Sequence, residues 1–195
     1  MNTQIRHTLA LLALLLPATL CQAASFSANL SGANEAPPNA SPGSGMVQLS
    51  FDPMAHMLGI DVTFGGLLAP STAAHIHCCT ALPGTGTAGV ATQTPSFNGF
   101  PLGVTAGTYN VAFNTALDST WSSAFLAAHG GAAGAEAAFG AGLLDGRAYF
   151  NIHSMAYPGG EIRGFLAPVP EPSPMAMLGA GLLGLLGWRL RRTAR

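Results

Sequence analysis

The chain has 195 residues, of which 49% are hydrophobic and only 8% are charged. All seven basic residues are arginines, and between residues 24 and 168 two arginines stand against seven acidic residues, a net charge of −5. A nucleic-acid-binding protein needs a basic face to neutralise phosphates, so this class of protein is excluded. A two-domain enzyme needs more chain than this middle segment has, and it is excluded as well.

Residues 1–23 have the features of a secretory signal peptide. Arg6 and His7 form a short basic region, and an apolar run from Leu9 to Leu16 follows it. This run is shorter than the roughly 20 apolar residues that span a bilayer, and it leads to a small-residue site. We therefore expect export and cleavage after Ala23 or Ala24.

Five segments in the middle of the chain alternate apolar and polar residues, the pattern of half-buried β-strands. They are residues 26–30, 47–51, 58–64, 109–113 and 148–152. Clusters of Gly, Pro and Asn lie between several of them. Many short strands joined by such turns predict an all-β domain, built as an antiparallel sandwich or barrel.

His75 and His77 flank Ile76 in the middle segment. Successive side chains of a strand point to opposite faces, so both imidazoles share one face while Ile76 points into the core. Histidines at this spacing lie roughly 6–7 Å apart at Cα, which allows both rings to reach one metal ion. The alternative is a pair of polar residues on a solvated strand face, hydrogen-bonded to each other or to water.

Cys78 and Cys79 follow directly, and they are the cysteines that remain once Cys21 is removed with the signal peptide. Three interpretations stay open. The pair forms a disulfide in the oxidising exported compartment, or it supplies thiolates beside the histidines, with Cys79 on their face, or it stays free. Sulfur together with imidazole would favour zinc or Cu(I) over calcium or magnesium.

Residues 121–144 depart from the strand pattern because they are rich in alanine. Large apolar residues recur in this segment at loosely helical spacings: Phe125, Leu126, Phe139 and Leu143. Gly130 and Gly131 divide it, which predicts one or two short helices inserted among the strands. Three further glycines weaken any helix here: Gly134, Gly140 and Gly142.

Residues 149–153 again alternate, with Phe150 and Ile152 on one face and His153 on the other, together with Tyr149 and Asn151. If this strand neighbours the first, a third imidazole joins His75 and His77. The sequence then predicts a zinc or copper site with an open coordination position. Imidazoles ligate only when neutral, so metal affinity should fall below about pH 6.5.

Motifs that mark enzymes are absent from the sequence: it has no Gly-x-Ser-x-Gly elbow, P-loop or dinucleotide fingerprint. Glu161 lacks the second nearby carboxylate that a glycosidase requires. At a spacing of two, Glu161 and Arg163 share a strand face and are expected to form a cross-strand ion pair. These observations favour a binding module over an enzyme.

The C-terminal tail, residues 169–195, has three parts in a fixed order. Val169-Pro170-Glu171-Pro172 comes first, then the apolar run Met175 to Trp188, then a cluster of arginines. An apolar run that ends in arginine predicts a transmembrane helix with its arginines in the cytoplasm. The tail closely resembles the PEP-CTERM sorting signal. That resemblance implies an exosortase-type processing enzyme as partner and an inner-membrane-anchored precursor, followed by delivery to the cell surface or the exterior.

The middle segment resembles the CHRD domain over residues 25–167. The resemblance rests on three motifs: Ala74-His75-Ile76-His77, Tyr149-Phe150-Asn151-Ile152-His153 and Pro158-Gly159-Gly160-Glu161-Ile162-Arg163-Gly164. It implies an antiparallel Greek-key sandwich over residues 24–168, immunoglobulin-like or superoxide-dismutase-like, with an extracellular binding role. Cys78-Cys79 departs from the family, whose usual members have a glycine and often a proline after the second histidine.

The sequence as a whole predicts an exported binding module of the cell surface or extracellular matrix, anchored in the membrane before sorting. Its ligand is an exopolysaccharide, a surface protein or a metal ion, and the sequence leaves these alternatives open. The alternative function is a copper- or zinc-dependent, superoxide-dismutase-like oxidoreductase that uses His75, His77 and His153. Such a copper site would need further imidazoles, and the mature chain offers only His56 and His129.

Overall fold

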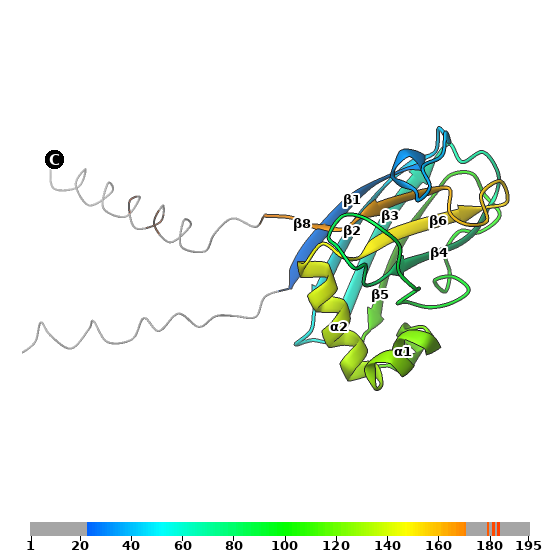
Figure 1. The fold of residues 1–195 in the computed structure, drawn as a ribbon. Coiled ribbons are helices and arrows are strands. Elements are labelled where there is room, and N and C mark those ends of the chain that lie inside the picture. Colours follow the sequence, from blue (N-terminus) through cyan, green and yellow to red (C-terminus); the bar gives the residue numbers. More distant parts are fainter. Residues whose placement is uncertain (1–22, 171–178, 180, 182, 184–195) are drawn as a thin grey trace, which may run out of the picture.

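A computed structural model describes residues 23–170 together with residues 179, 181 and 183 (Figure 1). The predicted signal peptide, apart from residue 23, and most of the predicted transmembrane run lie outside the described residues. Within the described part, no helix combines the length and apolar character needed to cross a membrane.

Eight strands and two helices make up the domain. The strands are β1 (Ala24–Ser31), β2 (Ser44–Asp52), β3 (Met57–Gly65), β4 (Ser71–His77), β5 (Gly107–Asn114), β6 (Tyr149–Ser154), β7 (Ile162–Phe165) and β8 (Ala167–Pro168). The helices are α1 (Ser123–His129) and α2 (Ala132–Leu144). Short 3-10 turns lie at Gly32–Asn34 and Asp118–Thr120. The predicted all-β class and the helical insertion are confirmed.

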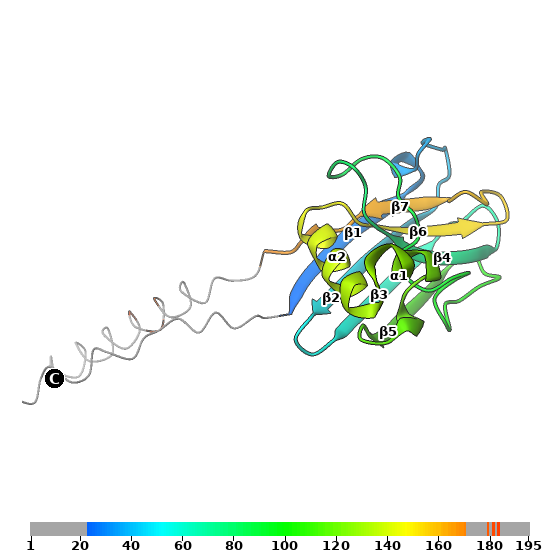
Figure 2. The same ribbon diagram turned by 60° about the horizontal axis from the view of Figure 1, so that its bottom comes forward.

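The strands form one antiparallel sheet in the order β4-β6-β7-β1-β2-β3-β5, with β8 paired to β1. The sequence predicted a Greek-key sandwich, whereas the hydrogen-bonded ladder is continuous and curls on itself (Figures 1 and 2). The sheet is continuous because β1 has partners on both of its edges. On one edge, β1 pairs along its whole length with β2. Its other edge is shared: Ser31 pairs with Arg163 of β7, and Ser27 pairs with Ala167 of β8.

The hydrophobic core fills the inside of the curl. Strand alternation places one face of each long strand there, as the fully buried side chains show: Phe26, Leu30, Leu58, Ile60, Ile76, Phe150 and Ile152. Both helices lie on the same side of the sheet (Figure 2). The ring of Phe139 on α2 lies 5.8 Å from that of Phe51 and 5.3 Å from that of Trp121, so α2 closes the core.

One part of the sheet is buried on both faces. β2 and β3 expose alternate residues, but five of the six residues of β6 are buried. Two irregular segments contact the outer face of β4 and β6: Pro95 and Ala88 contact the side chains of β4, and Glu35 contacts β6. On this outer face His75 and Asn151 are therefore buried, and His77 and His153 are half-buried.

Candidate metal centre

His75, His77 and His153 meet on this covered face. β4 and β6 are antiparallel neighbours. His153 lies opposite Ala73, which is two residues from His75 on β4, so His75 and His153 are diagonal neighbours on the same face of the sheet. The His75 ring lies 5.3 Å from that of His77 and 4.8 Å from that of His153, between ring centroids. Each ring has one nitrogen that lies within 4.8 Å of a nitrogen of each of the other two rings. The alternation that the sequence showed thus brings all three predicted histidines together.

In each imidazole, one of the two ring nitrogens forms a hydrogen bond with a main-chain carbonyl oxygen. The acceptors are the carbonyl oxygens of Pro95, Ala88 and Pro158, at 3.1, 2.8 and 2.8 Å from Nε2 of His75, Nδ1 of His77 and Nδ1 of His153. A carbonyl oxygen can only accept, so the nitrogen that faces it carries the proton. In the neutral ring, the remaining nitrogen then presents a lone pair.

The three remaining nitrogens are buried and have no hydrogen-bond partner: Nδ1 of His75, Nε2 of His77 and Nε2 of His153. A buried polar atom without a partner costs about 1–3 kcal/mol. Three converging lone pairs cannot satisfy one another, whereas a cation satisfies all of them. Metal-ligating histidines usually donate their other ring N–H to a carbonyl or carboxylate, and all three rings do so here.

Burial also keeps these rings neutral. Desolvation lowers the pKa of His75 and of His77 from 6.5 to about 4, and it lowers the pKa of His153. The neighbouring imidazoles add to the shift at His75, while the hydrogen bond to Pro95 opposes it. The sequence placed proton competition below about pH 6.5, and these shifts move it to lower pH. At neutral pH the lone pairs are free to bind an ion.

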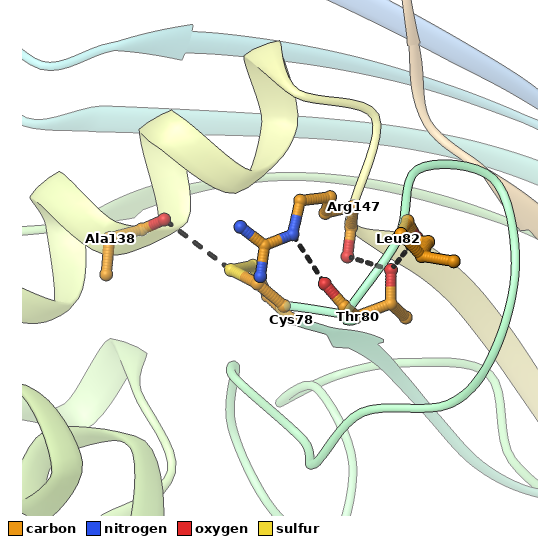
Figure 3. The surroundings of a disulfide bond; sticks show 6 residues. Cys78, Thr80, Leu82, Ala138 and Arg147 are labelled. Carbon is orange, nitrogen blue, oxygen red and sulfur yellow. Dashed lines mark hydrogen bonds between the residues drawn. A yellow bond between two sulfur atoms is a disulfide. The ribbon is translucent and has the colours of Figure 1, made fainter.

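Cys78 and Cys79 are bonded to each other in the structure. β4 ends at His77, so strand alternation does not extend to Cys79 and its sulfur does not join the imidazoles. Sγ of Cys79 instead lies 3.6 Å from the carbonyl oxygen of Ala138 on α2, and Figure 3 shows this surrounding. Of the three interpretations, thiolate ligation beside the histidines therefore has no geometric support.

Glu161 and Arg163 do not form the ion pair that the sequence predicted. Glu161 precedes β7 and is fully buried, and its Oε1 accepts hydrogen bonds from the hydroxyl of Ser41 at 2.5 Å and the amide of Leu68 at 2.7 Å. Nε of Arg163 lies 3.8 Å from Oε2 of Glu35. The prediction failed because it extended the strand to Glu161, where alternation no longer applies.

Sequence reasoning also missed two residues that border the centre. Asn151 lies directly opposite His75 and is 2% exposed, and its Nδ2 donates to Oε1 of Glu35 at 2.6 Å. The alternation that identified His153 places Asn151 on the same face, so a signal for Asn151 was present. Glu35 lies 116 positions away in sequence, in an irregular segment, and no local pattern indicates this contact.

An aromatic stack continues the site toward β7. The His77 ring stacks on Tyr149 with centroids 4.7 Å apart and planes 6° apart. The guanidinium of Arg163 lies 4.7 Å from the centroid of the same Tyr149 ring. A cation over an aromatic face is attracted to the ring, and this cation also contributes to the lowered pKa of His77. Tyr149 thus fixes the plane of one imidazole.

Two known families match this chain. The CHRD domain matches residues 26–166, which includes every strand residue that contributes to the histidine cluster. The PEP-CTERM protein-sorting motif matches residues 168–192. No curated protein and no solved structure matches the chain.

Proposed function

The chain belongs to the CHRD domain family and ends in a PEP-CTERM sorting motif, and we propose that its domain is a metal-binding module of the cell surface or extracellular matrix. The sorting motif implies export, a membrane-anchored precursor and processing by an exosortase. Of the three ligands that the sequence leaves open, a metal ion has the best support. The ion is zinc or copper, and His75, His77 and His153 are its ligands.

The proposal is carried by three imidazoles that each place a ring nitrogen within 4.8 Å of the others and that each have one buried nitrogen without a hydrogen-bond partner. Ligand nitrogens about 2.0–2.1 Å from one ion lie about 3.3–3.6 Å apart at trigonal or tetrahedral angles. Nitrogens within 4.8 Å of one another therefore need to approach by no more than about 1.5 Å to coordinate an ion. In the alternative left open by the sequence, the histidines are hydrogen-bonded to each other or to water, and none of these three nitrogens bonds to another ring.

The donor set favours zinc or copper. Neutral imidazole suits zinc, copper, iron and nickel, whereas calcium and magnesium prefer oxygen ligands. The superoxide-dismutase-like alternative gains no support. His56 bonds to Glu136 at 3.0 Å and His129 packs on Phe125 with ring centroids 4.4 Å apart, so neither adds an imidazole to the cluster.

The test is metal analysis of the exported protein purified from its host, followed by titration of the metal-free protein with Zn²⁺ and with Cu²⁺ at pH 7. We expect one ion per chain. His77→Ala should weaken binding by more than about 100-fold, because even loss of a group that supports a ligand costs 10- to 100-fold. The domain should stay folded, since Ile76 and not His77 fills the core.

His129→Ala is the matched control, because it removes an imidazole from α1 that lies outside the cluster. Its metal affinity should equal that of the unmodified protein. Absence of saturable Zn²⁺ and Cu²⁺ binding in the unmodified protein would refute the metal-binding function.

A further inference from the structure

Five buried side-chain polar atoms in the described part of the chain lack a hydrogen-bond partner. Three are the imidazole nitrogens of the candidate centre, one is Oε2 of Glu161, and one is Oδ1 of Asn151. Four of the five therefore belong to residues on one face of β4 and β6. All four are lone-pair acceptors, so none of them can donate to another.

The orientation of the Asn151 amide follows from its other end. Nδ2 donates to Oε1 of Glu35 at 2.6 Å, so Oδ1 points away from this carboxylate. In the sheet, Asn151 lies between Arg163 on β7 and His75 on β4. Glu35 lies on the Arg163 side, with its Oε2 3.8 Å from Nε of that arginine. Oδ1 is the end of the amide that does not face Glu35, it is buried without a partner, and His75 is the residue of β4 directly across from Asn151.

We propose that Asn151 supplies the fourth ligand of the metal centre and that its amide oxygen occupies the position that water or a small anion would otherwise take. This inference rests on the metal-binding function proposed above. The centre then has three imidazole nitrogens and one amide oxygen. Glu35 is a positioning residue, because it holds the amide in the orientation that presents oxygen and not nitrogen to the ion.

The physical reason for an amide oxygen lies in the burial of the site. Asn151 is 2% exposed and His75 is 7% exposed. His77 and His153 are half-buried, but their unpaired nitrogens are themselves buried, so contact of the centre with bulk water is limited. A buried carbonyl-type oxygen without a partner destabilises the fold, and coordination removes that cost together with those of the three nitrogens. The sequence predicted an open position, and an amide ligand would instead close it.

The test uses the full exported protein loaded with Cu²⁺ at pH 7. Electron paramagnetic resonance in water enriched in ¹⁷O detects a water molecule bound directly to copper, and azide titration measures access of a small anion. In the unmodified protein we expect coupling to three imidazole nitrogens, no ¹⁷O broadening and weak azide binding. Asn151→Ala should introduce the ¹⁷O broadening and bind azide at least about tenfold more tightly.

Variants of Glu35 test the positioning role without touching a ligand. Glu35→Ala frees the amide and should shift both readouts toward those of Asn151→Ala. Glu35→Gln retains an oxygen that accepts from Nδ2, so it should behave as the unmodified protein. Glu35→Ala also retains the Asn151 side chain, which keeps the test valid should Asn151→Ala not fold. Asn110→Ala is the matched control, because Asn110 bonds to Asp61 on the exposed side of the sheet.

The outcomes separate the two proposals. If the unmodified protein binds no Cu²⁺ through imidazole, the metal-binding function itself fails. If it binds Cu²⁺ through three imidazoles but already shows bound water and azide binding equal to that of Asn151→Ala, only the role of Asn151 is overturned. If Glu35→Ala matches the unmodified protein in both readouts, the positioning role of Glu35 is overturned.

Discussion

The tautomer of each imidazole in the cluster is set by main chain outside β4 and β6. Ala88 and Pro95 belong to the long segment between β4 and β5, and Pro158 belongs to the turn between β6 and β7. These carbonyls fix which nitrogen carries the proton before any ion arrives. Because folding already orders the three imidazoles, less loss of conformational entropy opposes metal binding.

We expect the free energy of unfolding to depend on pH through the Glu35 carboxyl. Burial raises its pKa from 4.5 to about 7, against the opposing effects of Arg163 and of its hydrogen bonds. A carboxyl with a raised pKa binds more protons in the folded state. Its contribution to the free energy of unfolding is therefore fully present below about pH 4.5, and it is lost as the pH rises through about 7.

Glu35→Gln removes this titration, while the histidines titrate in both proteins and cancel in the comparison. The stability of the unmodified protein relative to Glu35→Gln should fall by about 2–3 kcal/mol between pH 4.5 and pH 8. Urea unfolding of the metal-free proteins across this range measures it. A difference that does not change with pH would show that Glu35 titrates normally.

At the scale of elements, α2 leaves no room for a Cβ at any of its three glycines, and two of them face other parts of the domain core. A Cβ at Gly140 would lie 2.7 Å from Cε1 of Phe51, and a Cβ at Gly142 would collide with the sulfurs of Cys78 and Cys79. The sequence identified these glycines as weak points of a helix. The structure shows what they provide, which is room for β2 and for the cysteine pair.

Gly142→Ala should therefore destabilise the domain despite the better helix propensity of alanine. Overpacking of this kind typically costs about 1–3 kcal/mol, and urea unfolding measures it. The matched test repeats the substitution in Cys78→Ala/Cys79→Ala. With the sulfurs gone, Gly142→Ala should become neutral or stabilise by up to about 1 kcal/mol. An equal cost in both backgrounds would mean that the cysteine pair does not limit the approach of α2.

The elements that sequence patterns predicted are those with local signals. β1, β2, β3, β5 and β6 alternate over five or more residues and were found within a few positions. β8 was missed because a strand of two residues is too short to show a period. The strand expected from the spacing of Glu161 and Arg163 corresponds to β7, which begins one residue later, at Ile162. The three histidines follow from alternation alone, whereas the contact of Glu35 with Asn151 depends on how the chain returns to β6, which no local pattern encodes.

At the scale of the molecule, the two ends of the domain are neighbours. β1 begins at Ala24, and the amide of Val169 donates to the carbonyl of Ser25 at 2.8 Å. β1 extends from these ends to Ser31, which pairs with Arg163 beside the candidate metal centre. Eight residues of strand span roughly 25 Å. The candidate centre therefore lies roughly 25 Å from the point where the tail begins.

The position of β1 also bears on signal removal. Ala24 already pairs with Phe51, so a mature chain that begins near Ala24 or Ser25 keeps almost the whole strand. We expect mass spectrometry of surface-located protein to find this terminus and no Cys21. An intact Met1 on such protein would contradict cleavage and favour an N-terminal anchor.

The last prediction concerns the boundary between the domain and the tail. Deleting Met175 to Arg195 removes the predicted anchor but leaves β8, so the domain should fold and be released to the periplasm or the medium. Ending the chain after Leu166 instead removes the pairing of β8 with β1 and the hydrogen bond from Val169 to Ser25. Hydrogen bonds contribute about 0.5–1.5 kcal/mol each, so this shorter chain should unfold several degrees lower in a thermal melt. Equal melting temperatures would place the boundary before β8. Failure of the longer chain to fold would mean that the tail is part of the core.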